Sequence, residues 1–486
     1  MLAKLSVFLK TTILSLVLFF LLISFTSDFS NSKSPISEWI PSSDKESTDK
    51  TEKQSKESAT ASHLHIPAET ATALIQNAPP TASPVPPSGP VLKEGNPTLL
   101  EMAPAYVQAI MNSEDTSFPR LDCPVPNDHR YHHLKTNSTD TSHESTTTSS
   151  PKYFFALNLH QHASILPRLF GSIVESMRFL GPQDCALSVI EGRSDDGTFE
   201  ILLSLREEIE CMGAKYYFNS SNIDPPAGDR INAGDRIKAL AELRNQALQP
   251  LVDHYQKGTS TDDTTIVFLN DVAICSEDVL ELIHQRHYQN ADMVCGMDWT
   301  YVGPDPTFYD VWIARGMNGD TFFEIPEDGN WNSAWNIFWN NPIAQECIWV
   351  GKPFQVFSCW NGATVFTAKP FLESKIRFRS AHEHECPQGE PKTWCIEMWH
   401  LGYGKIAVVP IVNIEYSDEA ATKIKEAKGY VSNWMGAGGE SDARIEWEST
   451  PPQAVKCMPS YQNQTWVLWE EQLGEQDSAP RGVDLV

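Results

Sequence analysis

The chain has 486 residues, of which 41% are hydrophobic, and it carries a formal net charge of −26 at pH 7. This length is sufficient for a large core, and such an excess of carboxylates argues against a nucleic acid as partner. An anionic ligand would need a metal ion or a few well-placed arginines to offset the acidic field. The ten cysteines include no Cys-x-x-Cys pair, which argues against a zinc site.

The N-terminal segment predicts a membrane anchor. Residues 11–25 are almost wholly apolar, and the stretch becomes long enough to cross a bilayer when it is extended a few residues toward the N-terminus. Lys4 and Lys10 lie on that side, which predicts a cytosolic tail at 1–4, a transmembrane signal anchor at 5–26 and a lumenal remainder. The alternative is a cleaved signal peptide, although no small-residue cleavage signal follows the apolar stretch.

Three regions are expected after the anchor. Residues 27–117 are rich in Ser, Thr, Pro, Lys and Glu and contain little to bury, which predicts a disordered stem. A short helical pattern at 98–112 lies within it. Residues 118–460 are expected to form the folded domain, and 461–486 a C-terminal tail.

The first half of the folded domain alternates between strand and helix patterns. Short apolar runs with β-branched or aromatic residues predict strands, and apolar residues at three- and four-residue spacing predict helices. Such alternation favours right-handed crossovers and an α/β fold with a mostly parallel sheet flanked by helices. The expected strands are 153–158, 185–190, 215–218 and 266–269, and the expected helices are 165–180, 199–212, 236–248 and one that begins at 276.

Acidic and polar residues follow two of these strands. The fourth strand ends on Asn270-Asp271, and the second is followed at once by the turn Glu191-Gly-Arg-Ser-Asp-Asp-Gly-Thr198. Parallel strands bring these turns to one edge of the sheet, where α/β proteins bind ligands. A carboxylate there can hold a divalent cation, and the cation a diphosphate. Arg236 and Arg244, on the helix before the fourth strand, could face that diphosphate or pair with acidic neighbours.

The second half of the chain is rich in tryptophan. Of 14 tryptophans, 13 lie at or after Trp299, with local clusters at 331–335 and 359–362. Sugars stack their apolar faces on aromatic rings, so we interpret the region provisionally as a sugar-binding cleft. The alternative, that most of these rings fill an irregular core, also fits. Cys386 and Cys395 are close enough in sequence to bridge a loop, and no other pairing is assigned.

Taken together, the order of these segments resembles the nucleotide-sugar-dependent glycosyltransferases of the GT-A fold, which is Rossmann-like. The segments are Ser194-Asp-Asp-Gly-Thr198, Arg244-Asn-Gln-Ala-Leu248 and Phe268-Leu-Asn-Asp-Val272. Over 118–416 the chain is more similar to the fungal capsule-associated α-1,3-mannosyltransferases. The segments that carry this resemblance are 190–198, 269–272, Cys295-Gly-Met-Asp-Trp299, Phe308-Tyr-Asp-Val-Trp312 and 402–410.

One position departs from the general GT-A pattern. Its Asp-x-Asp motif is replaced by Asn270-Asp271-Val272, so Asp271 is the only carboxylate left there. A Mn²⁺ or Mg²⁺ ion held by Asp271 would need further ligands, either Asp298 or the diphosphate itself. The alternative for Asp271, a role as a turn residue or as a cap before a helix, stays open.

The resemblance also implies roles for other residues. Asp298 would orient the acceptor or complete the metal shell, and Glu397 would be the acidic residue on a helix near the end of the fold. Solvation or local pairing is the alternative for each, as Asx-turn chemistry is for the loop after the second strand. The residues implied in binding the nucleotide sugar are Glu191, Arg193, Asp195, Asp196, Arg244 and Asn270, and those implied in catalysis are Asp271, Asp298 and Glu397.

The function implied is a type II, single-pass membrane enzyme of the Golgi or another secretory-pathway membrane. It would transfer mannose from GDP-mannose to a mannose-containing glycan in an α-1,3 linkage, with retention of configuration, in the synthesis of a capsule or cell-wall polysaccharide. Its main task would be to stabilise the departing diphosphate. Two alternatives remain, a transferase with another nucleotide sugar and a non-catalytic protein of glycan binding or assembly.

Overall fold

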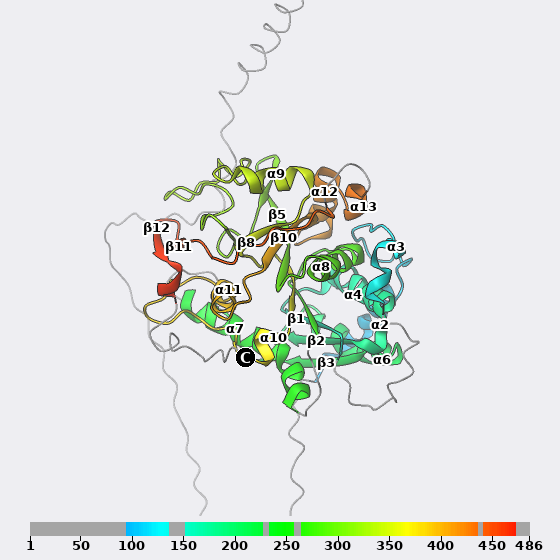
Figure 1. The fold of residues 1–486 in the computed structure, drawn as a ribbon. Helices are drawn as coiled ribbons and strands as arrows, with labels where there is room; N and C mark the ends of the chain where they lie inside the picture. The colour runs from blue at the N-terminus through cyan, green and yellow to red at the C-terminus, as the bar shows by residue number, and fades with distance from the viewer. Residues whose placement is uncertain (1–93, 136–150, 227–232, 257–263, 436–440, 473–486) are drawn as a thin grey trace, which may run out of the picture. The chain divides into compact units, whose positions relative to one another are not determined.

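The computed structural model describes residues 94–135, 151–226, 233–256, 264–435 and 441–472 (Figure 1). The expected cytosolic tail and the signal anchor at 5–26 lie outside these ranges. Within them, no helix combines the length and the apolar character that a membrane span requires.

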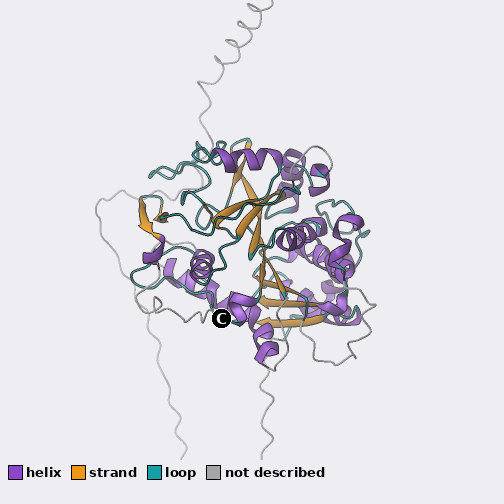
Figure 2. Cartoon of the chain, in the orientation of Figure 1, coloured by secondary structure: helices purple, strands orange, loops and turns teal. Residues whose placement is uncertain are grey.

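A mixed sheet forms the centre of the described chain (Figure 2). Its first four strands pair in parallel, β9 runs antiparallel between β4 and β5, and β5 and β10 are again parallel to each other. The expected α/β class is confirmed. In spatial order the strands are β3 (Lys215–Ser220), β2 (Cys185–Glu191), β1 (Tyr153–Leu159), β4 (Thr265–Leu269), β9 (Ala363–Thr367), β5 (Met293–Val302), β10 (Ile406–Ile414), β8 (Phe354–Ser358) and β7 (Arg315–Gly316), and β6 (Asp305–Phe308) pairs with β5.

Helices cover both faces of this sheet because its strands are apolar on both sides. On β1, Phe154 and Ala156 pack with α7 and α11, whereas Tyr153 and Phe155 point to the opposite face and pack with α4 and α8. The helices are α2 (Pro97–Met111), α3 (Asp128–Tyr131), α4 (Leu166–Leu180), α5 (Thr198–Ser204), α6 (Arg206–Cys211), α7 (Ala233–Gln256), α8 (Ser276–Tyr288), α9 (Pro342–Val350), α10 (Lys369–Leu372), α11 (Glu390–His400), α12 (Asp418–Lys428) and α13 (Val431–Trp434).

The four expected strands and the helices between them are confirmed, with two differences. The helix expected at 199–212 is divided between α5 and α6 at Leu205. Helix α7 continues eight residues past 248, through Pro250. Leu251 and Val252 are buried beyond that proline, so packing offsets the hydrogen bond that it removes.

The ordered chain extends beyond the expected domain boundaries at both ends. Helix α2 lies inside the segment expected to be a disordered stem, and it packs against α4 and α5. It does so through small and apolar side chains, among them Ala103, Ala109 and Ile110, which are buried. At the other end, β12 (Asn463–Leu468) pairs with β11 (Ala454–Ser460), although 461–486 was expected to be a tail.

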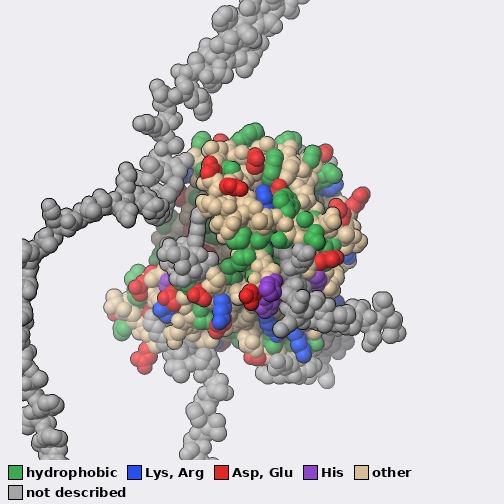
Figure 3. All heavy atoms as spheres, turned by 90° about the vertical axis from the view of Figure 1, so that its left-hand side faces the viewer, with side chains coloured by type: hydrophobic (Ala, Val, Ile, Leu, Met, Phe, Trp, Pro, Cys, Tyr) green, Lys and Arg blue, Asp and Glu red, His purple; other side chains and the backbone are tan. Residues whose placement is uncertain are grey.

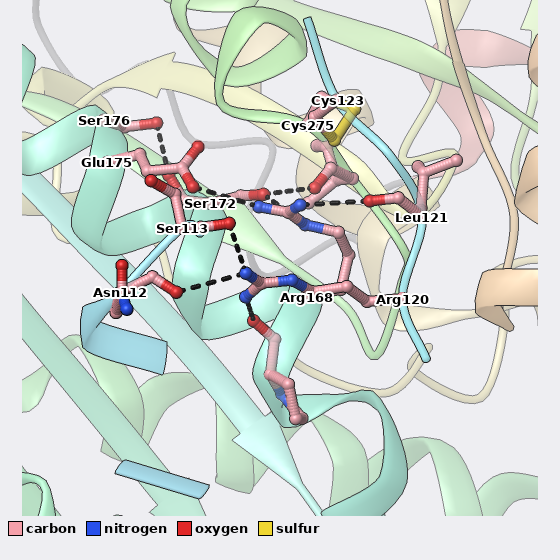
Figure 4. Close-up of polar contacts among 12 residues, drawn as sticks. Asn112, Ser113, Arg120, Leu121, Cys123, Arg168, Ser172, Glu175, Ser176 and Cys275 are labelled. Carbon is pink, nitrogen blue, oxygen red and sulfur yellow. Dashed lines mark hydrogen bonds and ion pairs between the residues drawn. A yellow bond between two sulfur atoms is a disulfide. The ribbon is translucent and has the colours of Figure 1, made fainter. Parts of the chain in front are cut away.

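Two arginines and a disulfide hold the segment after α2 against the sheet (Figure 4). Arg120 donates hydrogen bonds to the carbonyl oxygens of Ala109 (2.8 Å) and Asn112 (3.1 Å), which close the end of α2. Arg168 of α4 is buried and donates to the carbonyl oxygen of Leu121 at 3.1 Å. The Cys123–Cys275 disulfide then joins this segment to the loop after β4, four residues beyond Asp271.

Two further disulfides correct an expectation. Cys386 pairs with Cys457 and not with Cys395, and Cys295 pairs with Cys359. Cys395 lies buried on α11 as a free thiol. Sequence spacing gave no sign that β11 returns to the loop around Cys386, 71 residues earlier.

The tryptophans divide between core and surface. Trp360 and Trp394 are almost fully buried, whereas Trp335 is 72% and Trp349 is 68% exposed. On the face shown in Figure 3, hydrophobic, acidic and basic side chains are interspersed, and histidine side chains lie in its lower half. The provisional sugar-binding interpretation therefore concerns only part of the tryptophan-rich region.

Removal of the Cys123–Cys275 disulfide tests how much the link between the N-terminal segment and the loop after β4 stabilises the protein. We expect the paired change Cys123→Ser and Cys275→Ser to lower the free energy of unfolding by about 2–4 kcal/mol, because the bridge closes a loop of 152 residues. Denaturant unfolding without reductant measures this. Cys211→Ser, at an exposed free thiol, is the control and should change stability by less than about 0.5 kcal/mol. Equal stability of the two variants would contradict the expectation.

Candidate active site

The turn after β4 brings Asp271 to the edge of the sheet. The backbone N–H of Asn270 donates to the carbonyl oxygen of Gly362 at 2.8 Å, and that of Val272 donates to the carbonyl oxygen of Asn270 at 2.9 Å. Asp271 lines a cavity to which Gly192, in the loop after β2, also contributes. The two turns that the sequence placed at one edge therefore meet there.

Two cavities adjoin at this turn. The first, here named the β1–β2 cavity, has a volume of about 510 Å³, and the second, the β4–α11 cavity, about 450 Å³. Arg236 and Leu240 of α7 line both, and Asp271 and Asn270 belong to the first and the second respectively. Both volumes are in the range of small-molecule sites.

The β1–β2 cavity is lined by residues at the ends of strands, in the loops after them and on α7, and several of these residues are polar. Its lining residues are Asn158, Leu159, His160, His162, Ile190, Gly192, Ile223, Asp224, Pro225, Pro226, Arg236, Leu240, Leu243 and Asp271. The β4–α11 cavity is more aromatic. Its lining residues are Arg236, Ile237, Leu240, Arg244, Asn270, Tyr309, Asp310, Trp312, Ile313, Trp360, Pro387, Gln388, Gly389, Glu390, Pro391, Tyr416, Met458 and Pro459.

Asp271 forms an ion pair with His162, whose Nε2 lies 2.8 Å from Asp271 Oδ2. Burial alone would lower the pKa of His162, but its hydrogen bond to Asp271 and the negative charge there raise that pKa above 6.5. Burial would likewise raise the pKa of Asp271, and the contact with His162 instead lowers it below its ordinary value. Each side chain keeps about a third of its surface exposed, so the pair also faces the cavity.

The acidic residues of the loop after β2 bind the protein itself. Glu191 is buried and accepts hydrogen bonds from the Ser220 hydroxyl (2.8 Å) and the Ser194 backbone N–H. Asp196 accepts from the Ala163 backbone N–H at 2.8 Å, and the Asp195 carboxylate accepts from the side chain of Gln161. These contacts tie the loop after β1 to the loop after β2.

That tie fixes the histidines at the cavity. The backbone N–H of His162 donates to Thr198 Oγ1 at 2.9 Å, and Nδ1 of His160 contacts the carbonyl oxygen of Gly192. Glu191, Asp195 and Asp196, expected to bind the nucleotide sugar, do not line either cavity. Their carboxylates instead shape the loops that do, as the Asx-turn alternative anticipated.

Arg193 lies one step from the β1–β2 cavity. It adopts a left-handed backbone conformation (φ 57°), and its guanidinium pairs with the carboxylate of Asp224, a cavity residue, at 2.5 Å. Arg193 therefore does not line the cavity itself but contacts the carboxylate of Asp224, which does.

Arg244 lies where it was expected, at a cavity beside the turn after β4. It is buried, its Nε donates to Glu390 Oε1 at 2.7 Å, and its guanidinium lies 4.4 Å from the ring centre of Trp360. One of its terminal nitrogens, Nη1, is buried without a hydrogen-bond partner among the described residues. Asn270 accepts a hydrogen bond from Trp360 Nε1 at 3.1 Å, which orients the amide beside that arginine.

Asp298 is fully buried on β5 and does not line either cavity. Its Oδ2 accepts a hydrogen bond from the Tyr416 hydroxyl at 2.8 Å. Burial, and then the charge of Asp310, raise the pKa of Asp298 well above its ordinary value. Asp298 therefore acts on the β4–α11 cavity through Tyr416, which lines it.

Glu397 was expected in catalysis, and the structure places it elsewhere. It accepts an ion-pair contact from Arg379 at 2.6 Å and does not line either cavity. Glu390, at the N-terminal end of the same helix, lines the β4–α11 cavity. Glu397 lies seven positions after Glu390, roughly 10 Å along the helix axis. The sequence does not show which end of the helix approaches the cavity, so it could not decide between the two carboxylates.

Sequence reasoning gave no role to several cavity residues. Asp310, Tyr309 and Trp312 lie in the segment Phe308–Trp312, which was noted only for its resemblance, and Tyr416 follows β10. The signal that could have found Asp310 is a lone carboxylate in a segment of aromatic and apolar residues directly after a strand. His160 and His162 form a His-x-His pair at the end of the first strand, a place where they could flank the donor, and sequence spacing gives no sign of the contact with Asp271.

The residues at the turn fit a divalent cation only in part. The Asp271 carboxylate and the His162 imidazole are two adjacent donors, and no group of three or more His, Cys, Asp or Glu side chains suited to a metal ion occurs among the described residues. Cations such as Mg²⁺ commonly take one or two carboxylates and complete their shell with water and substrate phosphates. Asp271 and His162 fit that arrangement when a diphosphate supplies further oxygens.

An α/β protein with adjoining polar and aromatic cavities at the carboxyl edge of its sheet has the form of an enzyme for a bipartite small-molecule substrate. Residues 152–397 match the family described as cryptococcal mannosyltransferase 1, and the chain belongs to this family. It is 29% identical over 398 residues to the α-1,3-mannosyltransferase CMT1 of Cryptococcus neoformans var. neoformans serotype D, covering 77% of this chain and 83% of that one. The chain is therefore a glycosyltransferase that transfers mannose, and the non-catalytic alternative is set aside.

Solved structures show weaker likeness. The mannosyltransferase PcManGT from Pyrobaculum calidifontis, in complex with GDP-Man and Mn²⁺, has a TM-score of 0.31 and 10% identity, over 66% of this chain and 68% of that one. S. aureus TarS 1–349 also has a TM-score of 0.31, with 11% identity, over 55% of this chain and 60% of that one. Such scores assign no role to individual residues.

The ion pair at the turn can be tested by titration. We expect Asp271→Asn to lower the pKa of His162, because the burial that lowers it remains and the carboxylate that raises it is gone. Histidine ring resonances followed by NMR between pH 5 and 8 measure this. Asp195→Asn, which changes a carboxylate bound to Gln161, is the matched control. A His162 pKa that stays above 6.5 in the Asp271 variant would show that another group holds the proton.

Proposed function

We propose that the enzyme transfers mannose from GDP-mannose to a mannose-containing glycan, forming an α-1,3 linkage with retention of configuration, on a GT-A-type fold. The observation that carries this proposal is the position of Asp271, at the junction of two adjoining cavities. The similarity to an α-1,3-mannosyltransferase over most of the chain supports the linkage.

The two cavities suit the two ends of such a reaction. The nucleotide would bind in the β1–β2 cavity, which is lined by residues of the loops after β1 and β2, by Asn158 near the end of β1 and by Asp224 after β3. The diphosphate would lie at Asp271, and the mannose and acceptor would extend into the β4–α11 cavity, whose aromatic rings suit sugar faces. Arg236 borders both, as expected of a group that contacts the phosphates between them.

The chemistry required of the protein is mainly electrostatic. As the sugar leaves, negative charge grows on the diphosphate, and groups already aimed at it lower the barrier. Arg244 is well suited because it is buried and oriented by Glu390 and Trp360, and because one terminal nitrogen has no hydrogen-bond partner in the part of the chain that the structure describes. A bound Mn²⁺ or Mg²⁺ would neutralise part of the same charge, and Asp271 and His162 are the residues that would hold it.

The location in the cell is also part of the proposal. The apolar segment near the N-terminus supports a single-pass type II anchor in a Golgi or other secretory-pathway membrane, with the catalytic domain on the lumenal side. Three disulfides in the folded domain support an oxidising compartment.

The transfer reaction tests the donor and the linkage together. We expect the full-length chain, given GDP-mannose, Mn²⁺ and an α-mannobiose acceptor, to form an α-1,3-linked trisaccharide, and Asp271→Ala to lower kcat by about 10²–10³-fold. Product mapping by NMR and release of GDP measure both effects. Asp253→Asn on the exposed side of α7 is the control. Turnover of UDP-linked sugars in place of GDP-mannose would contradict the donor assignment.

The cation has its own test. Because Asp271 and His162 supply only two donors, we expect EDTA to abolish transfer and excess Mn²⁺ or Mg²⁺ to restore it. Calorimetry should find tight Mn²⁺ binding only when GDP is present, since the diphosphate completes the shell. Full activity in EDTA would show that Arg244 and its neighbours stabilise the diphosphate without a metal.

A further inference from the structure

Asp310 is a carboxylate built into the wall of the β4–α11 cavity that neither sequence nor family assigned. It lies in the turn after β6, half-buried, and the backbone N–H of Asn361 donates to its Oδ2 at 3.0 Å. The side chain of Asn361 donates in turn to the carbonyl oxygen of Gly296 on β5, at 2.8 Å. The carboxylate is thus held in one orientation by the turn between β8 and β9, which is itself hydrogen-bonded to β5.

A second acid supports the first from beneath. Asp298 is fully buried, accepts the Tyr416 hydroxyl, and has one oxygen, Oδ1, without a hydrogen-bond partner among the described residues. The backbone N–H of Tyr309 donates to the carbonyl oxygen of Asp298 at 3.1 Å, which fixes the turn that carries Asp310. A fully buried acid with a half-buried acid beside it is costly for stability, so the pair next to a cavity points to a function.

The surroundings of Asp310 have the chemistry of a sugar site. Tyr309 and Trp312, which lie on either side of Asp310 in the turn, line the same cavity, and Tyr309 is 47% exposed. The ring of Trp312 stacks on Tyr461 with 4.8 Å between centroids, which keeps it in place. Burial raises the pKa of Asp310 to about 6, so it is ionised at neutral pH and accepts hydrogen bonds. Sugars supply the matching groups, hydroxyl donors and apolar C–H faces.

We propose that Asp310 is the carboxylate that binds hydroxyl groups of the acceptor sugar, in the cavity that Tyr309 and Trp312 also line. Asp298 and Tyr416 act through the turn and the cavity wall as positioning residues. The inference rests on the proposed transfer of mannose to a sugar acceptor, and it assigns the acceptor to the β4–α11 cavity. A role only as a turn cap is the competing account, since the backbone N–H of Ala314 also donates to the Asp310 carbonyl oxygen.

Kinetics on the full-length chain separate these accounts. We expect Asp310→Asn to raise KM for α-mannobiose by about tenfold or more, because hydroxyl donors lose a charged acceptor. KM for GDP-mannose, and the slow release of GDP without acceptor, should change less than about twofold. Asp305→Asn, at an exposed aspartate of the same β5–β6 hairpin, is the matched control. An unchanged acceptor KM, or an equal rise for donor and acceptor, overturns the proposal.

A binding measurement keeps the inference independent of the donor. Saturation-transfer NMR with α-mannobiose alone should show ring protons close to the wild-type protein and a strongly weakened signal with Asp310→Asn. If that result holds while GDP-mannose is not turned over, the donor assignment fails and the acceptor site stands. Should Asp310→Asn not fold, Tyr309→Phe, which removes one exposed hydroxyl, is expected to weaken acceptor binding by about threefold. Equal acceptor affinity of that variant and the wild type would then overturn the proposal.

Discussion

For the proposed reaction, the constraint on which the site depends is that an anionic diphosphate must bind to a protein with a net charge of −26. The structure meets it by limiting the free negative charge at the turn after β4. Asp271 is paired with His162, and Glu390 is paired with Arg244. Because each carboxylate has a cationic partner within 3 Å, the local field is far less repulsive than the whole-chain charge implies.

The carboxylates of the loop after β2 are also bound by groups of the protein itself. Its carboxylates accept backbone and hydroxyl hydrogen bonds from Ser194, Ser220 and Ala163, so they fix loops that would otherwise be free to move. A charged group that accepts several such bonds stabilises a loop more than a neutral one does. The ligand-facing edge is then left to His162, Gly192 and the backbone. The carboxylates that the sequence predicts to bind the nucleotide sugar thus hold the loops whose other residues line the cavity.

The sequence predicted the parts of the fold that depend on local patterns. The strands from Tyr153 to Leu269 and the helices between them follow apolar periodicity within single segments, which needs no knowledge of partners. The insertion of β9 between β4 and β5, and the Cys386–Cys457 pairing, depend on contacts between distant segments that spacing does not encode. The same holds for the site. Asp271 could be placed at a cavity because it follows a strand. That Glu390 lines a cavity and Glu397 does not depends on the approach of α11 to the sheet, which sets the turn of the helix that faces the cavity.

Fully buried Asp298 and half-buried Asp310, of which only Asp310 lines the second cavity, show why such positions cannot be predicted from local sequence patterns. By propensity and burial alone, Asp298 in the middle of β5 and Asp310 beside it should be apolar, since an apolar pair of similar volume would be at least as stable. The Tyr416 hydroxyl donates to one oxygen of Asp298, and a backbone N–H donates to one oxygen of Asp310. The presence of both acids makes sense when the cavity requires a fixed acceptor of hydrogen bonds. Places where a sequence works against its own core are therefore where the chemistry of this enzyme is best sought.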